Sequence, residues 1–326
     1  MLCAGITSIS FKYSHLIYKI KKIIVTILKQ RSQSAGNFIF FNFNFFKVEN
    51  KSISETLRNK SVIKKISVHI PTHLKPINNN EFGHYLAGLI DGDGHFSNQL
   101  QLIIAFNEKD ASLAYYIKGR IGYGNVYKVK NKKAIILVIS NQFGLVTILE
   151  LINGKLRTEN KFNQINKNVL SNSKIKLSSD FYKNTDNDLN NHWLAGFSDA
   201  DASFQIKIIS RNNKTEVRLN FQIDQKKDDL LMLIKNYFGG NIGYRKSQDS
   251  YYYGSTSFGS AKKIIKYFDH FHLLSSKHVN YLKWRKSYII IQNKEHLLNS
   301  GLAKIIKLKK TMNRKSSQVE ENNNTD

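Results

Sequence analysis

The sequence has one cysteine, two prolines and few acidic residues, and these shortages narrow the range of possible functions. Cys3 alone cannot form an intramolecular disulfide or a cysteine-based zinc site, so any bound metal must be held by oxygen or histidine ligands. The 24 acidic residues are outnumbered by 50 Lys and Arg, which gives a net charge of +26 and a pI near 9.9. A polyanion is therefore the expected partner.

Long apolar runs are also missing. Lys19, Lys21 and Lys22 break the best one and Asn42 and Asn44 the next, so no run reaches the roughly 18 residues that a membrane span needs. We therefore expect a nucleic acid, and no membrane, as the partner. The bias toward Lys, Asn, Ile, Phe and Tyr is typical of an AT-rich gene and hints at an organellar genome.

The two ends of the chain differ in composition from its middle. Residues 1–78 contain no acidic residue before Glu49 and carry aromatic-rich patches such as 38–41. They fit either a presequence-like leader or translated host-frame sequence, and we favour the second; poor order is expected in both cases. The polar tail, 311–326, is expected to be disordered.

The middle of the chain repeats itself. The segment from His84 to Phe96 recurs 108 residues later, from His192 to Phe204. Shorter matches follow, such as Gly124-Asn125-Val126 with Gly240-Asn241-Ile242. A length of 326 residues also favours two domains. We therefore predict a first repeat at 79–170, a linker at 171–188 and a second repeat at 189–310.

Strict alternation follows the second copy of the repeated segment. Phe204, Ile206 and Ile208 alternate with polar residues, and 217–223 does the same, which predicts a half-buried antiparallel hairpin with its turn at Asn212-Asn213. A helix (229–238), a strand pair (241–257) and two helices (260–272 and 276–294) should follow. The predicted fold is α+β, with two pseudo-symmetric αββαββα repeats that each contain an antiparallel sheet.

Each repeated segment is predicted to be a helix that ends in acidic residues. The small pairs Ala87-Gly88 and Ala195-Gly196 would let the two helices pack closely about a pseudo-twofold axis. Carboxylates at the negative end of a helix dipole repel one another, and a divalent cation relieves this repulsion. The sequence thus predicts a metal site where four aspartates meet, namely Asp91, Asp93, Asp199 and Asp201.

The two segments resemble the paired signature of the LAGLIDADG homing endonucleases, of the single-chain type found in mitochondrial group I introns. Leu86 to Gly94 matches the nine-residue pattern at all but one position, and Leu194 to Ala202 is looser; the resemblance covers roughly 81–294. It implies a monomeric, mitochondrial enzyme that promotes intron mobility. Such an enzyme hydrolyses one phosphodiester per DNA strand across the minor groove, with Mg²⁺ or Mn²⁺, and its two sheets form a DNA-binding saddle around the central motif helices.

The resemblance also implies roles for single residues. Asp93 and Asp201 would bind metal, helped by the carbonyls of Gly92 and Ala200. Asp91 and Asp199 would instead serve the helix ends. The family's other positions near the scissile phosphates map onto four polar residues, which are Lys161, Lys277, Gln225 and Glu108.

The polar strand faces are the predicted reading surface, because Gln, Asn, Arg and Lys can address base edges in the major groove. Two sheets that each cover about one helical turn would span roughly 20 bp of double-stranded DNA. Asp93 to Glu108 is 15 residues, against 24 from Asp201 to Gln225, so the first half should contact fewer bases. The predicted DNA contacts are Gln101, Lys128 and Lys130 in the first copy and Gln205, Lys207, Arg218, Asn220, Gln222 and Arg245 in the second.

The sequence allows other functions and sites. An RNA maturase that assists splicing of its host group I intron is the alternative function, while an inactive relic is disfavoured because both Asp93 and Asp201 are present. His270 and His272 could suggest a metal site, but alternate residues on a helix point apart and no cysteine assists. Trp193 and Trp284 are expected in the core.

Overall fold

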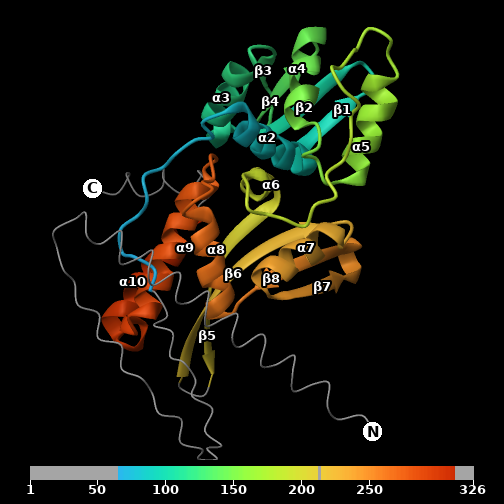
Figure 1. The fold of residues 1–326 in the computed structure, drawn as a ribbon. Helices are drawn as coiled ribbons and strands as arrows, with labels where there is room; N and C mark the ends of the chain where they lie inside the picture. The colour runs from blue at the N-terminus through green and yellow to red at the C-terminus, as the bar shows by residue number, and fades with distance from the viewer. Residues whose placement is uncertain (1–64, 212–213, 313–326) are drawn as a thin grey trace, which may run out of the picture. The chain divides into compact units, whose positions relative to one another are not determined.

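The computed structural model describes residues 65–211 and 214–312 (Figure 1). The predicted turn at Asn212-Asn213, most of the predicted N-terminal extension and nearly all of the predicted tail lie outside the described residues. Among the helices of the described part, none is long and apolar enough to cross a membrane.

The first repeat starts with a helix that is capped by local hydrogen bonds. Asn78 accepts from the backbone N–H of Glu81 at 2.9 Å, and Glu81 accepts from the N–H of Ile77 at 2.8 Å, which satisfies two otherwise unpaired donors. Its helices and strands are α2 (Asn79–Asp93), β1 (Gly94–Ser97), β2 (Gln101–Asn107), α3 (Ala111–Ile121), β3 (Asn125–Lys128), β4 (Ala134–Ile139), α4 (Gln142–Ile152) and α5 (Glu159–Ile165).

The second repeat follows a segment, 171–188, that contains neither helix nor strand. Its elements are α6 (Trp193–Asp201), β5 (Ala202–Arg211), β6 (Lys214–Gln225), α7 (Asp229–Phe238), β7 (Asn241–Arg245), β8 (Ser250–Ser255), α8 (Phe258–Phe268) and α9 (Lys277–Gln292). A further helix, α10 (Asn299–Thr311), was not predicted.

The two sheets have the same topology, β1-β2-β4-β3 in the first repeat and β5-β6-β8-β7 in the second, with all pairs antiparallel. This confirms the α+β fold of two related repeats. Each repeat closes with two helices, as predicted for the second repeat, so the full element order is αββαββαα, one helix longer than αββαββα.

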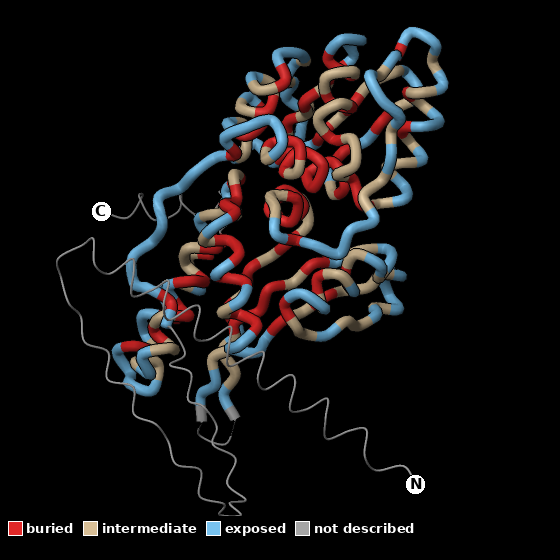
Figure 2. The backbone as a smooth tube through the Cα atoms, in the orientation of Figure 1, coloured by how far each residue is buried: buried red, intermediate tan, exposed pale blue. Residues whose placement is uncertain are grey.

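The core of the second repeat lies between its sheet and its helices (Figure 2). Phe204 of β5 pairs with Phe221 of β6, and its ring centroid lies 5.5 Å from those of both Phe268 in α8 and Trp284 in α9. The alternation predicted for this hairpin is therefore confirmed. Trp193 and Trp284 are fully buried, as expected.

Candidate active site and nucleic-acid interface

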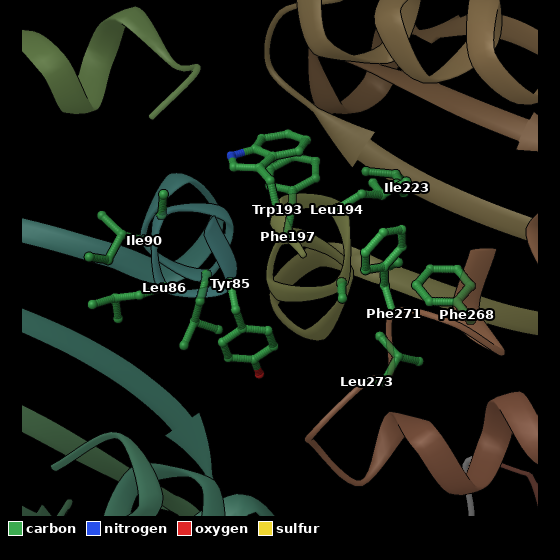
Figure 3. Close-up of a cluster of buried hydrophobic side chains, with 14 of the residues drawn as sticks. Tyr85, Leu86, Ile90, Trp193, Leu194, Phe197, Ile223, Phe268, Phe271 and Leu273 are labelled. Carbon is green, nitrogen blue, oxygen red and sulfur yellow. The ribbon is translucent and has the colours of Figure 1, made fainter. Parts of the chain in front are cut away.

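The helices α2 and α6 pack backbone to backbone between the two sheets (Figure 1). A Cβ on Gly88 would lie 1.8 Å from the carbonyl oxygen of Trp193, and a Cβ on Gly196 would lie 1.9 Å from that of Tyr85. Trp193 and Phe197 stack beside this contact, with ring centroids 4.8 Å apart (Figure 3). The close approach predicted from the small residues is confirmed, and it brings the C-terminal ends of both helices together.

The inner aspartates, Asp91 and Asp199, tie the two helices to each other. Trp193 Nε1 donates to Asp91 at 2.8 Å, and Tyr85 Oη, from the matching position of the other helix, donates to Asp199 at 2.7 Å. Each carboxylate also accepts three hydrogen bonds from the loop that precedes α5 or α9. Burial raises the pKa of both groups and these hydrogen bonds oppose it, so the two aspartates act as buried structural acceptors.

The outer aspartates, Asp93 and Asp201, lie at the same helix ends and are less buried than the inner pair. Asp93 is exposed and Asp201 half-buried. A Cβ on Gly92 would lie 2.3 Å from Ala200 Cβ and 3.0 Å from Asp201 Oδ2, so only glycine permits this approach.

The charge of Asp93 is poorly compensated. Desolvation and then the charge of Asp201 raise the pKa of Asp93 to about 6. Desolvation also raises the pKa of Asp201, against the hydrogen bond from Gln225 and the charges of Lys277 and Lys161. Within the described part of the chain no hydrogen bond reaches the Asp93 carboxylate. Two carboxylates this close, one of which raises the pKa of the other, fit a divalent cation with oxygen ligands.

A lysine flanks the acid pair on each side. Lys277, at the start of α9, donates to the carbonyl of Ala200 at 2.5 Å, and Lys161, in α5, donates to that of Gly94 at 2.5 Å. Burial lowers the pKa of both amines, whereas the nearby aspartates raise it. The structure thus brings together four of the predicted catalytic residues.

Gln225 also joins this group, because its Nε2 donates to Asp201 Oδ2 at 2.7 Å. Glu108 does not. In each repeat, the first residue after the motif helix pairs with a residue of the second strand: Gly94 pairs with Ile104, and Ala202 with Ile223. Gln225 lies two residues after Ile223, so its counterpart in the first repeat is Phe106, two residues after Ile104. The prediction for Glu108 was wrong because it counted from the end of the strand in a shorter hairpin. Glu108 instead pairs with Lys128, its Oε1 lying 2.7 Å from Lys128 Nζ.

The second sheet carries polar residues on the face opposite its helices. Gln205 lies across from Asn220 and Lys207 from Arg218. Asn220 is only 2% exposed, because it lies beneath its neighbours and donates to Gln205 and Gln222 at 3.1 and 3.3 Å. It therefore differs from the exposed base reader that was expected, and it orders the two glutamines instead.

Arg245, in β7, completes this face. Its Nη1 donates to Asp224 at 2.7 Å, and its guanidinium lies 4.6 Å from the ring centroid of Tyr252. Arg218 is likewise paired with Glu216, at 2.7 Å. Both arginines are thus held in fixed directions by acidic neighbours.

The first sheet presents a different surface. Gln101 lies on the outer face of β2, but Lys128 pairs in register with the buried Ile135 and therefore belongs to the helix-covered side. Lys130 lies beyond the end of β3 and is exposed. The exposed residues of the outer face of β3 are Asn125 and Tyr127, which the sequence analysis missed although strand parity would have found them.

Comparison with known proteins gives one family match, three relatives and one solved structure. Residues 194–288 match the family model described as LAGLIDADG endonuclease. The "uncharacterized cox1 intron-2 37.2 kDa protein" of Schizosaccharomyces pombe is 58% identical, over 94% of this chain and 95% of its own length.

Two Saccharomyces cerevisiae proteins are more distant. The intron-encoded DNA endonuclease aI3 is 29% identical, over 67% of this chain and 65% of that protein. The intron-encoded RNA maturase bI4 is 26% identical, over 76% of this chain and 36% of that protein. Among solved structures, I-SmaMI bound to uncleaved DNA in the presence of calcium ions has the same fold, with a TM-score of 0.54 and 22% identity over 72% of this chain and 99% of that one.

Proposed function

The chain belongs to the LAGLIDADG endonuclease family, and from this we propose that it is a single-chain homing endonuclease that hydrolyses one phosphodiester on each DNA strand across the minor groove. One observation carries the proposal. Asp93 and Asp201 converge from two different helices, and a lysine flanks each side of the pair. A structural role alone does not explain Asp93, whose carboxylate accepts no hydrogen bond from the described residues although a second carboxylate lies nearby.

The acid pair would hold a divalent cation, Mg²⁺ or Mn²⁺, with the carbonyls of Gly92 and Ala200 as further ligands. When bound, such an ion polarises the phosphate, activates water and stabilises the leaving oxygen. Gln225 would orient Asp201, to which it already donates. Lys277 now donates to the carbonyl of Ala200 and would turn from it to the scissile phosphate, where a buried ammonium offsets developing negative charge.

The polar face of the second sheet would read bases in the major groove, with Gln205, Lys207, Gln222 and Arg245 as the foremost contacts. Asn220 would support the glutamines from below. The first sheet offers fewer polar side chains, through Gln101, Asn125 and Tyr127, and would contact fewer bases. We propose that a monomer covers a target of roughly 20 bp, two turns of duplex.

The intron-encoded relatives support a proposal for the target and origin. The S. pombe relative, which is similar over nearly its whole length, is named for the second intron of cox1. We propose that this chain is encoded in a mitochondrial intron, acts in the mitochondrion and cleaves joined exons that lack the intron. Cleavage there would promote intron mobility. We also propose that 1–78 is an extension before the first repeat, that 171–188 links the two repeats and that 311–326 is a tail after the second.

The test is cleavage of a DNA duplex that carries the joined cox1 exons, with Mg²⁺, against the same duplex interrupted by the intron. We expect double-strand breaks in the first duplex only, and none with Asp93→Asn or Asp201→Asn. DNA affinity should fall steeply with salt, because phosphate contacts by lysine and arginine release counterions. Intact exon duplex, under conditions where the protein binds it, would overturn the proposal.

A maturase function is the second candidate, since one relative is named an RNA maturase. It predicts that the protein accelerates splicing of its own intron RNA and that Asp93→Asn leaves this acceleration unchanged. The two activities can coexist. Splicing acceleration without cleavage of the exon duplex would favour the maturase.

A further inference from the structure

Three histidines from separate parts of the chain converge outside the acid pair. His73 belongs to the extended segment 65–77, His272 follows α8, and His278 lies in the first turn of α9. One ring nitrogen from each can be chosen so that all three lie within 4.8 Å of one another. The ring centroid of His73 lies 5.2 Å from that of His272 and 4.3 Å from that of His278.

Two of the ring nitrogens are unpaired within the described residues and are therefore available as metal ligands. Nδ1 of His272 and Nδ1 of His278 are buried without a hydrogen-bond partner in the described part of the chain, and His272 is only 4% exposed. Unpaired buried polar atoms are costly and call for an explanation, such as an ion. His73 Nε2 lies 2.8 Å from the carbonyl oxygen of Leu273, and by donating to it would leave Nδ1 free as a ligand.

The rings of His272 and His278 are also in the protonation state that metal binding needs. Desolvation, followed by the charges of the other two rings, lowers the pKa of His278 to about 4. Desolvation likewise lowers the pKa of His272. Both rings are therefore neutral at pH 7, with lone pairs available.

We propose that His73, His272 and His278 form a zinc site that fastens residues 65–77 onto the second repeat. Three imidazoles and a water make a tetrahedral Zn²⁺ site. Its nitrogens would lie about 3.3 Å apart, as Zn–N bonds of about 2.0–2.1 Å require. The rings would thus draw together by roughly 1.5 Å at most, and the exposed His73 can supply most of that movement.

The site strengthens an attachment that the protein already makes. Gln292 of α9 accepts from the N–H of Ile66 at 2.8 Å and donates to its carbonyl at 3.0 Å. Arg285, itself paired with Asp269, donates to the carbonyls of Ser67 and His69 at 3.1 and 3.0 Å. Residues 65–77 then lead into α2 of the first repeat (Figure 1). Zinc would therefore lock a strap that joins the two repeats, next to the turn that carries Lys277.

The sequence analysis rejected a metal site at His270 and His272. That argument placed both residues on one helix, whereas α8 ends at Phe268 and both follow it; the cluster contains His272 but not His270. The cluster could not be predicted from the sequence, because His73 lies about 200 residues from His272 and comes near it only through the docking of residues 65–77.

The test is zinc titration by calorimetry of the full chain after treatment with EDTA, in the presence of saturating Mg²⁺ so that the acid pair is already occupied. We expect one Zn²⁺ per chain, a rise in Tm of roughly 5 °C, and slower amide exchange across residues 65–77. His73→Ala and His278→Ala should each weaken zinc binding more than about tenfold. Because His73 is exposed, its variant should fold normally, as circular dichroism can verify.

His69→Ala is the matched control, since this exposed histidine lies on the same segment but outside the cluster. It should bind zinc like the wild type. Absence of stoichiometric zinc binding, or binding that His73→Ala and His278→Ala leave unchanged, would overturn the proposal. Neither result bears on DNA cleavage, which is measured separately.

Discussion

Replacing Asp93 by asparagine should make the metal-free protein more stable while it abolishes cleavage. The pKa of Asp93 is raised to about 6, from the value of about 4 that an exposed aspartate has. A raised pKa means that ionisation costs the folded state more than the unfolded state. The cost builds up as pH rises from about 4 to about 6, and it is fully present above 6.

The size of this effect follows from the pKa and from the exposure of the side chain. A pKa of about 6 in place of about 4 corresponds to roughly 3 kcal/mol. Asp93 is exposed, so solvent screening reduces this figure to about 1 kcal/mol. Removing the charge at pH 7.5 should therefore raise Tm by about 2–4 °C for repeats of this combined size. At pH 4 the gain should vanish.

The assay is thermal unfolding in EDTA at pH 7.5 and pH 4, with Asp91→Asn as the matched control. Asp91 lies two residues earlier in the same helix, but it is buried and accepts four hydrogen bonds. The side-chain NH₂ group of an asparagine there would face hydrogen-bond donors and could not accept from them. Asp91→Asn should therefore lower the free energy of unfolding by about 3 kcal/mol at pH 7.5. If Asp93→Asn lowers Tm as Asp91→Asn does, the account of a strained, cation-binding pair is refuted.

Three further predictions follow from the same geometry. Gly88→Ala should lower the free energy of unfolding by about 3 kcal/mol, because its Cβ would lie 1.8 Å from a backbone oxygen. The control, Gly119→Ala, has no neighbour among the described residues within 4 Å of its Cβ on α3 and should raise the free energy of unfolding by up to about 1 kcal/mol. Urea unfolding measures both. Calcium affinity, measured by calorimetry, should fall about tenfold per pH unit below pH 6, since protons compete with the ion for Asp93. Lys277→Met should slow single-turnover cleavage about a hundredfold with little change in DNA affinity, and an unchanged rate would remove Lys277 from the site.

Much of this architecture could be predicted from the sequence, because it depends on local patterns. The strict alternation around Phe204 fixes the buried face of the hairpin, and the Ala-Gly pairs in both motifs require two closely packed helices. The recurrence of the whole segment made the pairing of Asp93 with Asp201 predictable as well. These features need no knowledge of loop lengths.

The errors arose where hydrogen-bond register decides. Glu108 was placed by counting to the end of a strand, but the shortened hairpin of the first repeat shifts the match to Phe106. Lys128 was predicted to contact DNA because of its charge. Its position in β3 places it instead on the helix-covered side of the sheet, where it pairs with Glu108. Asn220 has the right parity but lies beneath two glutamines, which only side-chain packing reveals.

The hydrogen bonds between the two motif helices also could not be predicted from the sequence. Tyr85 and Trp193 occupy equivalent positions, and each donates to the inner aspartate of the other helix. The phenol of Tyr85 and the indole of Trp193 differ in shape, so comparing the two repeats does not show that they have the same role. The contact appears only once the two helices are seen together.

The central claim is that Asp93 and Asp201 form one shared active site and not two independent ones. It is tested most directly by strand-resolved cleavage of a duplex labelled differently on each strand, with Asp93→Asn and Asp201→Asn tested singly. The shared site predicts that each variant loses cleavage of both strands. A variant that still nicks one strand at the wild-type rate would contradict it.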